Sequence, residues 1–138
     1  MMARFHEFVA AQDPLYPQVL AELRAGRKQT HWMWFVFPQL RDLGRSERAR
    51  FYGIIDLAEA REYLAHPVLG PRLRECTALV NAVSAKSAHD IFGSPDDLKF
   101  RSCMTLFSRA GGGEAFATAL AKYYDGIEDP ETLRLLGF

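Results

Sequence analysis

The feature that most constrains this sequence is a ten-residue apolar stretch from His31 to Leu40. It holds both tryptophans of the chain and two of its ten phenylalanines. As a helix the stretch would present aromatic or aliphatic groups on every side, and as a strand both its faces would be apolar. Either form is expected to be buried on all sides. Because burying each large aromatic side chain is worth roughly 1.5–3 kcal/mol, we expect the other elements to wrap around this one.

Length and composition predict one folded domain spanning residues 1–138. The chain has 49% hydrophobic and 25% charged residues, which is typical of a globular protein and argues against disorder. Seventeen basic and seventeen acidic residues give a formal net charge of zero. Proteins that follow a phosphodiester backbone usually carry a basic excess, so this balance argues against nucleic acid as a partner.

Neither a membrane anchor nor a disulfide is expected. No window approaches the roughly 18 apolar residues that a membrane span needs, and the first residues lack the apolar core of a signal peptide. Cys76 and Cys103 lie 27 residues apart without a CxxC pattern or a histidine at ligand spacing. We interpret them as buried free thiols and predict a cytoplasmic protein.

Helix-starting signals recur along the chain and predict an all-α fold. Three Asp-Pro or Ser-Pro pairs combine an N-cap side chain with a proline at the first helical position: Asp13-Pro14, Ser94-Pro95 and Asp129-Pro130. Asp56 with Glu59, and Ser87 with Asp90, have the spacing of capping boxes. We predict a compact bundle of seven to nine mostly short helices around the aromatic stretch.

One segment leaves two structures open. Phe51 to Ile55 is aromatic and β-branched, which is typical of a strand. A lone strand would lack partners, and Ser46 is a plausible N-cap for a helix running through Tyr52. We therefore expect this segment to be helical or irregular.

Sequence motifs of known chemistry are absent. The chain has no glycine-rich nucleotide loop, no zinc-protease helix, no serine nucleophile elbow and no EF-hand loop. Its four histidines are scattered, and none shares a helix face with another ligand at metal spacing. We predict no metal and no cofactor.

Polar residues around the aromatic stretch are the first candidates for a site. Lys28 and His31 are three residues apart, and a cation beside an imidazole can hold an anionic ligand. Alternatively, Lys28 is a solvated cation at a helix end and His31 an edge histidine. Trp34 could stack on a flat ligand or fill the core, and Gln39 could face a pocket or close a turn.

The second candidate group lies in two later helices. Arg72 falls in a first helical turn, where it opposes the helix dipole, so it either binds an anion or forms a salt bridge with Glu75 or another acid. Lys99, Ser102 and Thr105 are spaced three residues apart, on the flank between the solvent side and the buried side of a helix. An amphipathic helix without any function would show the same pattern.

With both groups in view, the chain resembles domain-of-unknown-function family 1810 from about Phe8 to Leu136. The resemblance is carried by six blocks: Ala21–Lys28, His31–Gln39, Leu43–Ser46, Tyr63–Leu73, Ile91–Gly93 with Asp96–Lys99, and Ser102–Phe107. It implies an all-helical fold and no particular activity. Some members carry the label calpastatin, a disordered protease inhibitor that a compact globular chain does not match. Cys103 departs from the family pattern, which has a serine there.

Our functional hypothesis is a pocket beside the aromatic core for a small anionic or nucleotide-like molecule. The expected ligand-binding residues are Lys28, Trp34, Gln39, Arg72, Lys99, Ser102 and Thr105. If the protein is an enzyme, His31 is the best general acid or base and Asp97 its best carboxylate partner. The alternatives are a non-catalytic protein-interaction or scaffold domain, and a nucleic-acid module resting on Arg41, Arg45, Arg48 and Arg50. The sequence leaves the oligomeric state open.

Overall fold

The architecture is helical throughout the residues that the structure, a computed structural model, describes, which are 4–138. They form ten α-helices and one short 3-10 helix: α1 (Phe5–Gln12), α2 (Tyr16–Ala25), α3 (Met33–Val36), η1 (Arg41–Leu43), α4 (Glu47–Phe51), α5 (Leu57–Ala65), α6 (Leu69–Asn81), α7 (Ala88–Phe92), α8 (Asp96–Arg109), α9 (Glu114–Tyr124) and α10 (Pro130–Leu136). The all-α prediction is confirmed. The helices exceed the predicted seven to nine because the chain folds into several pieces of only four or five residues, α3, α4 and α7.

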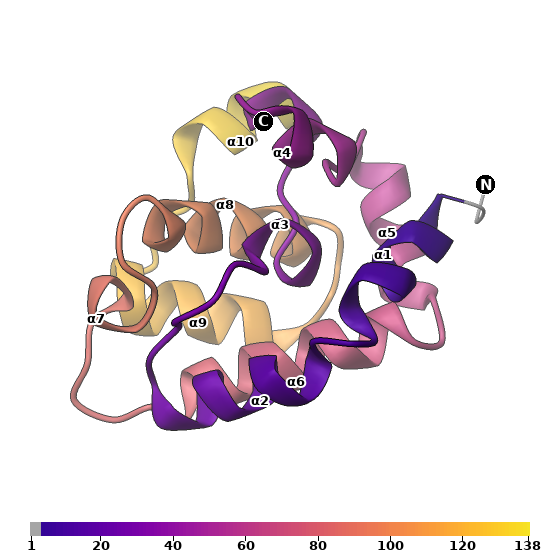
Figure 1. The fold of residues 1–138 in the computed structure, drawn as a ribbon. Helices are drawn as coiled ribbons and strands as arrows, with labels where there is room; N and C mark the ends of the chain where they lie inside the picture. The colour runs from indigo at the N-terminus through magenta and orange to yellow at the C-terminus, as the bar shows by residue number, and fades with distance from the viewer. Residues whose placement is uncertain (1–3) are drawn as a thin grey trace.

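The elements surround α3, which lies across the middle of the molecule in Figure 1. Helices α2 and α6 pack side by side, and α9 packs on both α6 and α8. Helix α10 covers α8, and α4 and η1 lie at the same end of the molecule as the C-terminus. None of the helices within residues 4–138 has the length and apolar composition needed to cross a membrane.

The aromatic stretch forms the centre of the core, as predicted. Trp32 has no exposed surface, and Phe35 and Phe37 are buried. The Phe37 ring makes edge-to-face contacts with Phe92 and Phe100 at centroid distances of 5.9 and 5.0 Å. The prediction of burial on every side was wrong at His31, which is exposed, and at Trp34, which is half-buried.

A buried carboxylate fixes the entry into this stretch. Glu22 on α2 accepts hydrogen bonds from Gln29 N at 2.7 Å, from Thr30 N and Oγ1 at 3.1 and 2.6 Å, and from Trp32 Nε1 at 3.0 Å. Burial alone raises the pKa of Glu22, but the hydrogen bonds from Thr30, Gln29 and Gln18 outweigh it and lower that pKa to about 2. The loop before α3 is therefore tied to α2 by one acid.

Four predicted N-caps are confirmed. The side chains of Ser46, Asp56, Ser87 and Asp129 each accept a hydrogen bond from the backbone three residues on. Ser87 and Asp90 form the complete reciprocal capping box. These signals succeed because they depend only on neighbouring residues.

Two predicted caps were wrong. The peptide N–H of Asp13 continues α1 by bonding to Val9 O, and its carboxylate forms an ion pair with Arg72 at 2.9 Å, so α2 begins three residues later. At α8 the N-cap position falls on Pro95 rather than Ser94. In the first case a partner distant in the sequence holds the side chain that the cap would have used.

The segment predicted to be helical or irregular contains both forms. Helix α4 ends at Phe51, and Ile54 then makes an isolated parallel bridge with Leu40, through Arg41 N to Ile54 O at 2.8 Å and Ile54 N to Gln39 O at 2.9 Å. Gly53 permits this approach, because a Cβ there would lie 2.3 Å from the Cα of Arg41. The bridge brings Arg41 beside α4.

Helix α8 is more deeply buried than its sequence pattern suggested. Every residue from Ser102 to Phe107 is buried. Thr105 has no exposed surface because α10 covers that side of the helix, so its expected position on a flank was wrong.

The prediction of buried free thiols is confirmed for both cysteines. Burial raises the pKa of Cys76 to about 12 and that of Cys103 well above its usual value.

Candidate functional site

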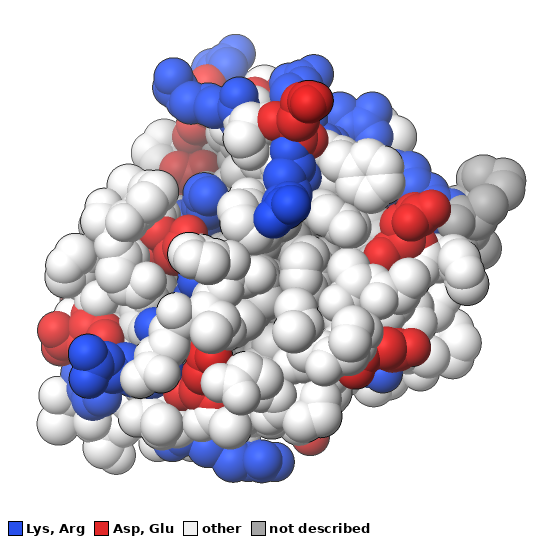
Figure 2. All heavy atoms as spheres, viewed as in Figure 1, with Lys and Arg blue, Asp and Glu red and all other residues white. Residues whose placement is uncertain are grey.

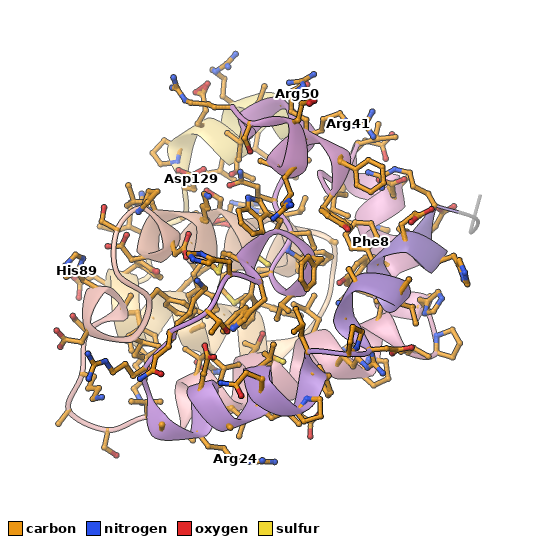
Figure 3. All side chains as sticks on the ribbon, viewed as in Figure 1. Phe8, Arg24, Arg41, Arg50, His89 and Asp129 are labelled. Atoms are coloured by element: carbon orange, nitrogen blue, oxygen red, sulfur yellow. The ribbon has the colours of Figure 1, made fainter. Side chains whose placement is uncertain are left out.

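An open cavity of about 840 Å³ lies where α1, η1 and α4 meet. Four arginines, two glutamates and two aromatic residues line it: Arg4, Arg41, Arg48, Arg50, Glu7, Glu47, Phe51 and Tyr52. Figure 2 shows basic side chains gathered over this end of the molecule, and Figure 3 labels Arg41 and Arg50 close together there. We refer to this feature as the arginine cavity.

Local backbone structure places the arginines. The bridge between Leu40 and Ile54 fixes the backbone of Arg41, and Gly53 lies directly against it. Ser46 caps α4 through Ala49 N at 3.1 Å, which sets the short helix that carries Arg48 and Arg50. The guanidinium of Arg4 donates to Gly53 O, so the start of α1 is tied to the same turn.

Three of these arginines have no acidic partner among the described residues. Arg41, Arg48 and Arg50 form no ion pair within residues 4–138, although Glu7 and Glu47 line the same cavity. The Arg41 Nε atom is buried and makes no hydrogen bond there. Arg48 and Arg50 are exposed and Arg41 is half-buried, so their charge is available to a ligand.

Trp34 is not among the residues that line the arginine cavity, but two cations lie over its ring. The guanidinium carbon of Arg48 lies 5.0 Å from the ring centroid, and the Lys99 ammonium lies 5.8 Å away. Because Arg48 also lines the cavity, one side chain connects the cavity with the tryptophan.

The two predicted lysines share one carboxylate. Lys28 Nζ lies 2.9 Å from Asp96 Oδ2, and Lys99 Nζ lies 3.7 Å from Asp96 Oδ1. The Lys28 side chain is only 7% exposed, and its ammonium lies 5.1 Å from the Trp32 ring centroid. Both cations are thus partly neutralised before any ligand arrives.

The proposed acid–base residues are not brought together. His31 is exposed, and its side chain makes no hydrogen bond or ion pair among the described residues. The Asp97 carboxylate lies 3.4 Å from Nδ1 of His89 instead and accepts a hydrogen bond from Leu98 N at 2.9 Å. Gln39 is half-buried, and its backbone carbonyl accepts the hydrogen bond from Ile54 N in the bridge.

Arg72, another predicted ligand-binding residue, makes its contacts with α1 and α2 and the turn between them. Arg72 pairs with Asp13, donates to Gln12 Oε1 at 3.2 Å and lies over the Tyr16 ring at 4.6 Å. The salt bridge considered for it therefore forms, with Asp13 rather than Glu75.

Ser102 and Thr105 meet Asp129 at the start of α10. Ser102 Oγ donates to Asp129 Oδ2 at 3.0 Å, and Thr105 Oγ1 accepts from Asp129 N at 2.9 Å while donating to Arg101 O. Figure 3 labels Asp129 where α10 begins above α8. Both hydroxyls are engaged in holding α10.

From the sequence, Arg41, Arg48 and Arg50 were predicted, together with Arg45, only as part of a nucleic-acid surface. The signal that could have indicated a site was the series of arginines that ends directly before two aromatic residues, Phe51 and Tyr52. Among residues 4–138, no group of three or more histidine, cysteine, aspartate or glutamate side chains is placed to hold a metal ion.

The family model described as "Protein of unknown function (DUF1810)" matches residues 2–136. The chain belongs to this family. The chain is also similar to the conserved hypothetical protein Rv1873 from Mycobacterium tuberculosis, whose crystal structure is known. The two share 58% sequence identity, and their structures superpose with a TM-score of 0.94 over 96% of each chain. A search of curated proteins finds no match. These likenesses place the chain in the DUF1810 family and bring no assigned activity with them.

Proposed function

We propose that this DUF1810 protein binds a small anionic molecule in the arginine cavity. The observation that carries the proposal is that Arg41, Arg48 and Arg50 line one cavity without an ion pair to any acid of the described chain. By contrast, Lys28, Arg72, Arg109 and Arg134 each have a carboxylate within 2.9 Å.

The size and chemistry of the cavity suit such a ligand. Its volume of about 840 Å³ falls within the range of pockets that hold small molecules, roughly 300–1,000 Å³. Guanidinium groups bind phosphates and carboxylates through paired, charge-assisted hydrogen bonds. The exposed ring of Phe51 and the half-buried ring of Tyr52 add an apolar wall beside these donors.

This proposal keeps the ligand class expected from the sequence and changes its location. Lys99 stays connected to the arginine cavity through Trp34 and Arg48. Lys28 lies over Trp32 instead, and Arg72, Ser102 and Thr105 are bound to other helices. We propose binding only and assign no reaction. A cytoplasmic location is kept as a prediction, since buried free thiols suit a reducing compartment.

Thermal unfolding in the presence of anions tests the proposal. At low ionic strength, inorganic phosphate, pyrophosphate and AMP should raise the melting temperature in a concentration-dependent way, because a ligand that binds only the folded state stabilises it. The double variant Arg41→Gln/Arg50→Gln should lose this response.

The matched control is Arg24→Gln/Arg27→Gln, which removes the same charge from exposed positions; Figure 3 labels Arg24 at the opposite end of the molecule from Arg41 and Arg50. This variant should respond like the native chain. An absence of stabilisation by every anion, or an equal response in both double variants, would refute the proposal.

A protein-interaction domain is the second candidate. It is favoured by a smaller cavity of about 270 Å³, whose lining includes Ile55, 53% exposed, together with Leu135 and Leu136 of α10. If this surface binds a protein, Ile55→Asp should abolish a stoichiometric complex in light scattering while leaving the anion response intact. A complex unaffected by Ile55→Asp would exclude this surface.

A further inference from the structure

We infer that the ligand of the arginine cavity combines a phosphate group with a flat aromatic ring, as a mononucleotide does, and that its ring stacks on Trp34 in place of Arg48. The inference rests on the proposed anion binding and goes further by naming the ligand class and the surface that selects it.

Trp34 differs from the other tryptophan in being accessible. Trp32 has no exposed surface and its indole N–H is bonded to Glu22, whereas Trp34 is half-buried and none of its described contacts is a hydrogen bond. Trp34 packs against the core, and two flexible cationic side chains, Arg48 and Lys99, also lie over its ring. Such a cover can move aside without disturbing the core.

Arg48 is the residue that couples the ring surface to the cavity. Its guanidinium, 5.0 Å from the Trp34 centroid, is planar and lies where a flat ligand ring would lie. The same side chain lines the arginine cavity, which holds Arg41 and Arg50. A phosphate bound there offers Arg48 charge-assisted hydrogen bonds, which are stronger than an exposed cation–π contact.

The exchange gives a ligand with both parts an advantage over either part alone. A phosphate without a ring draws Arg48 into the cavity but puts nothing in its place on the Trp34 ring. A ring without a phosphate must displace Arg48 with nothing to receive its charge. The structure therefore favours compounds that carry the two groups on one small scaffold, since aromatic stacking on tryptophan tolerates many ring types.

Tryptophan fluorescence titrations with AMP, ribose 5-phosphate and adenosine at equal ionic strength test the inference. In the native chain AMP should quench the emission and bind at least roughly tenfold more tightly than ribose 5-phosphate, with adenosine weakest. The quenching should come from Trp34, because Trp32 is enclosed.

Two variants separate the ring from the phosphate. In Trp34→Leu, calorimetry should show AMP binding no more tightly than ribose 5-phosphate, with ribose 5-phosphate binding unchanged, which also shows that the variant folds. In Arg48→Met, adenosine should bind more tightly than to the native chain, because the Arg48 guanidinium no longer lies over the Trp34 ring, and ribose 5-phosphate should bind more weakly.

The outcomes that overturn the inference differ from those that overturn anion binding. Equal affinities of the native chain for AMP and ribose 5-phosphate would leave anion binding intact and exclude the stacking surface. Loss of the AMP preference in Phe51→Leu, but not in Trp34→Leu, would place the ring on the exposed Phe51 instead. Failure of all three compounds to bind would overturn both proposals.

Discussion

The carboxylate of Glu22 accepts the indole N–H of Trp32 at 3.0 Å, so the largest fully buried side chain of the core is oriented by an acid on the neighbouring helix. The same carboxylate accepts the backbone N–H groups of Gln29 and Thr30. Loss of these hydrogen bonds would leave the loop that leads into α3 without its attachment to α2.

Acid should therefore destabilise the protein through Glu22. Its pKa is about 2 in the folded chain, against 4.5 for an ordinary glutamate, so its stabilisation is complete above pH 4.5 and is lost as the pH falls towards 2. The shift corresponds to about 3 kcal/mol of unfolding free energy. Urea unfolding measured between pH 6 and pH 2.5 should show this decline.

Glu22→Gln should lower the unfolding free energy at pH 7 by about 2–3 kcal/mol. The side-chain NH2 group of glutamine is itself a donor, so it cannot accept the hydrogen bonds that the second carboxylate oxygen accepts in the native chain. It should also flatten the decline between pH 4.5 and 2. The exposed Glu114→Gln is the control and should change stability by less than about 0.5 kcal/mol. An unaltered pH profile in Glu22→Gln would contradict this account.

Phe100 should be among the costliest residues to truncate. It is fully buried and stacks on Phe92 at 4.7 Å while contacting Phe37 edge-on. Phe100→Ala should cost about 3–5 kcal/mol in chemical denaturation. Leu98→Ala on the same helix, at a position 57% exposed, should cost less than about 1 kcal/mol. Similar losses for the two variants would show that the aromatic cluster is not the centre of the core.

Thr105 and Ser102 should matter for stability and not for ligand binding. Thr105→Val keeps the shape of the side chain but leaves Asp129 N without an acceptor, and should cost about 1–3 kcal/mol. Ser102→Ala should cost about 1 kcal/mol. Both can be measured by thermal unfolding, with phosphate or AMP affinity measured in parallel. A large loss of ligand affinity with unchanged stability would contradict this prediction and indicate that Ser102 and Thr105 contact the ligand.

Gly53 should tolerate no side chain. In Gly53→Ala the new Cβ would lie 2.3 Å from the Cα of Arg41, so the bridge must shift and stability should fall by more than about 2 kcal/mol. Gly111→Ala provides a comparison, because that glycine has a φ of +84° but open space around it, and should cost only about 1 kcal/mol. Thermal unfolding compares the two, and an equal cost would mean that steric contact at Gly53 is not decisive.

Local signals explain what could be predicted of the fold. The caps at Ser46, Ser87 and Asp129 depend on residues three positions away, and the burial of Trp32 follows from an unbroken apolar run. The failures arose where a distant partner decides. The chain segment containing Asp13 continues α1 and pairs with Arg72.

The place of the candidate site could not be read from the sequence. Of the three cations expected in a pocket with Trp34, the structure brings only Lys99 to its ring, beside Arg48, while Lys28 lies over Trp32 and Arg72 over Tyr16. The arginine cavity, however, is built from α1, η1 and α4 around the bridge at Ile54, a contact between residues that no local pattern pairs.

Isothermal titration calorimetry with AMP at low ionic strength tests anion binding in the arginine cavity most directly. We predict saturable binding by the native chain, an affinity weakened at least roughly tenfold in Arg41→Gln/Arg50→Gln, and an affinity within about twofold of native in the matched control Arg24→Gln/Arg27→Gln. No saturable heat from the native chain, or the same affinity in both double variants, would contradict it.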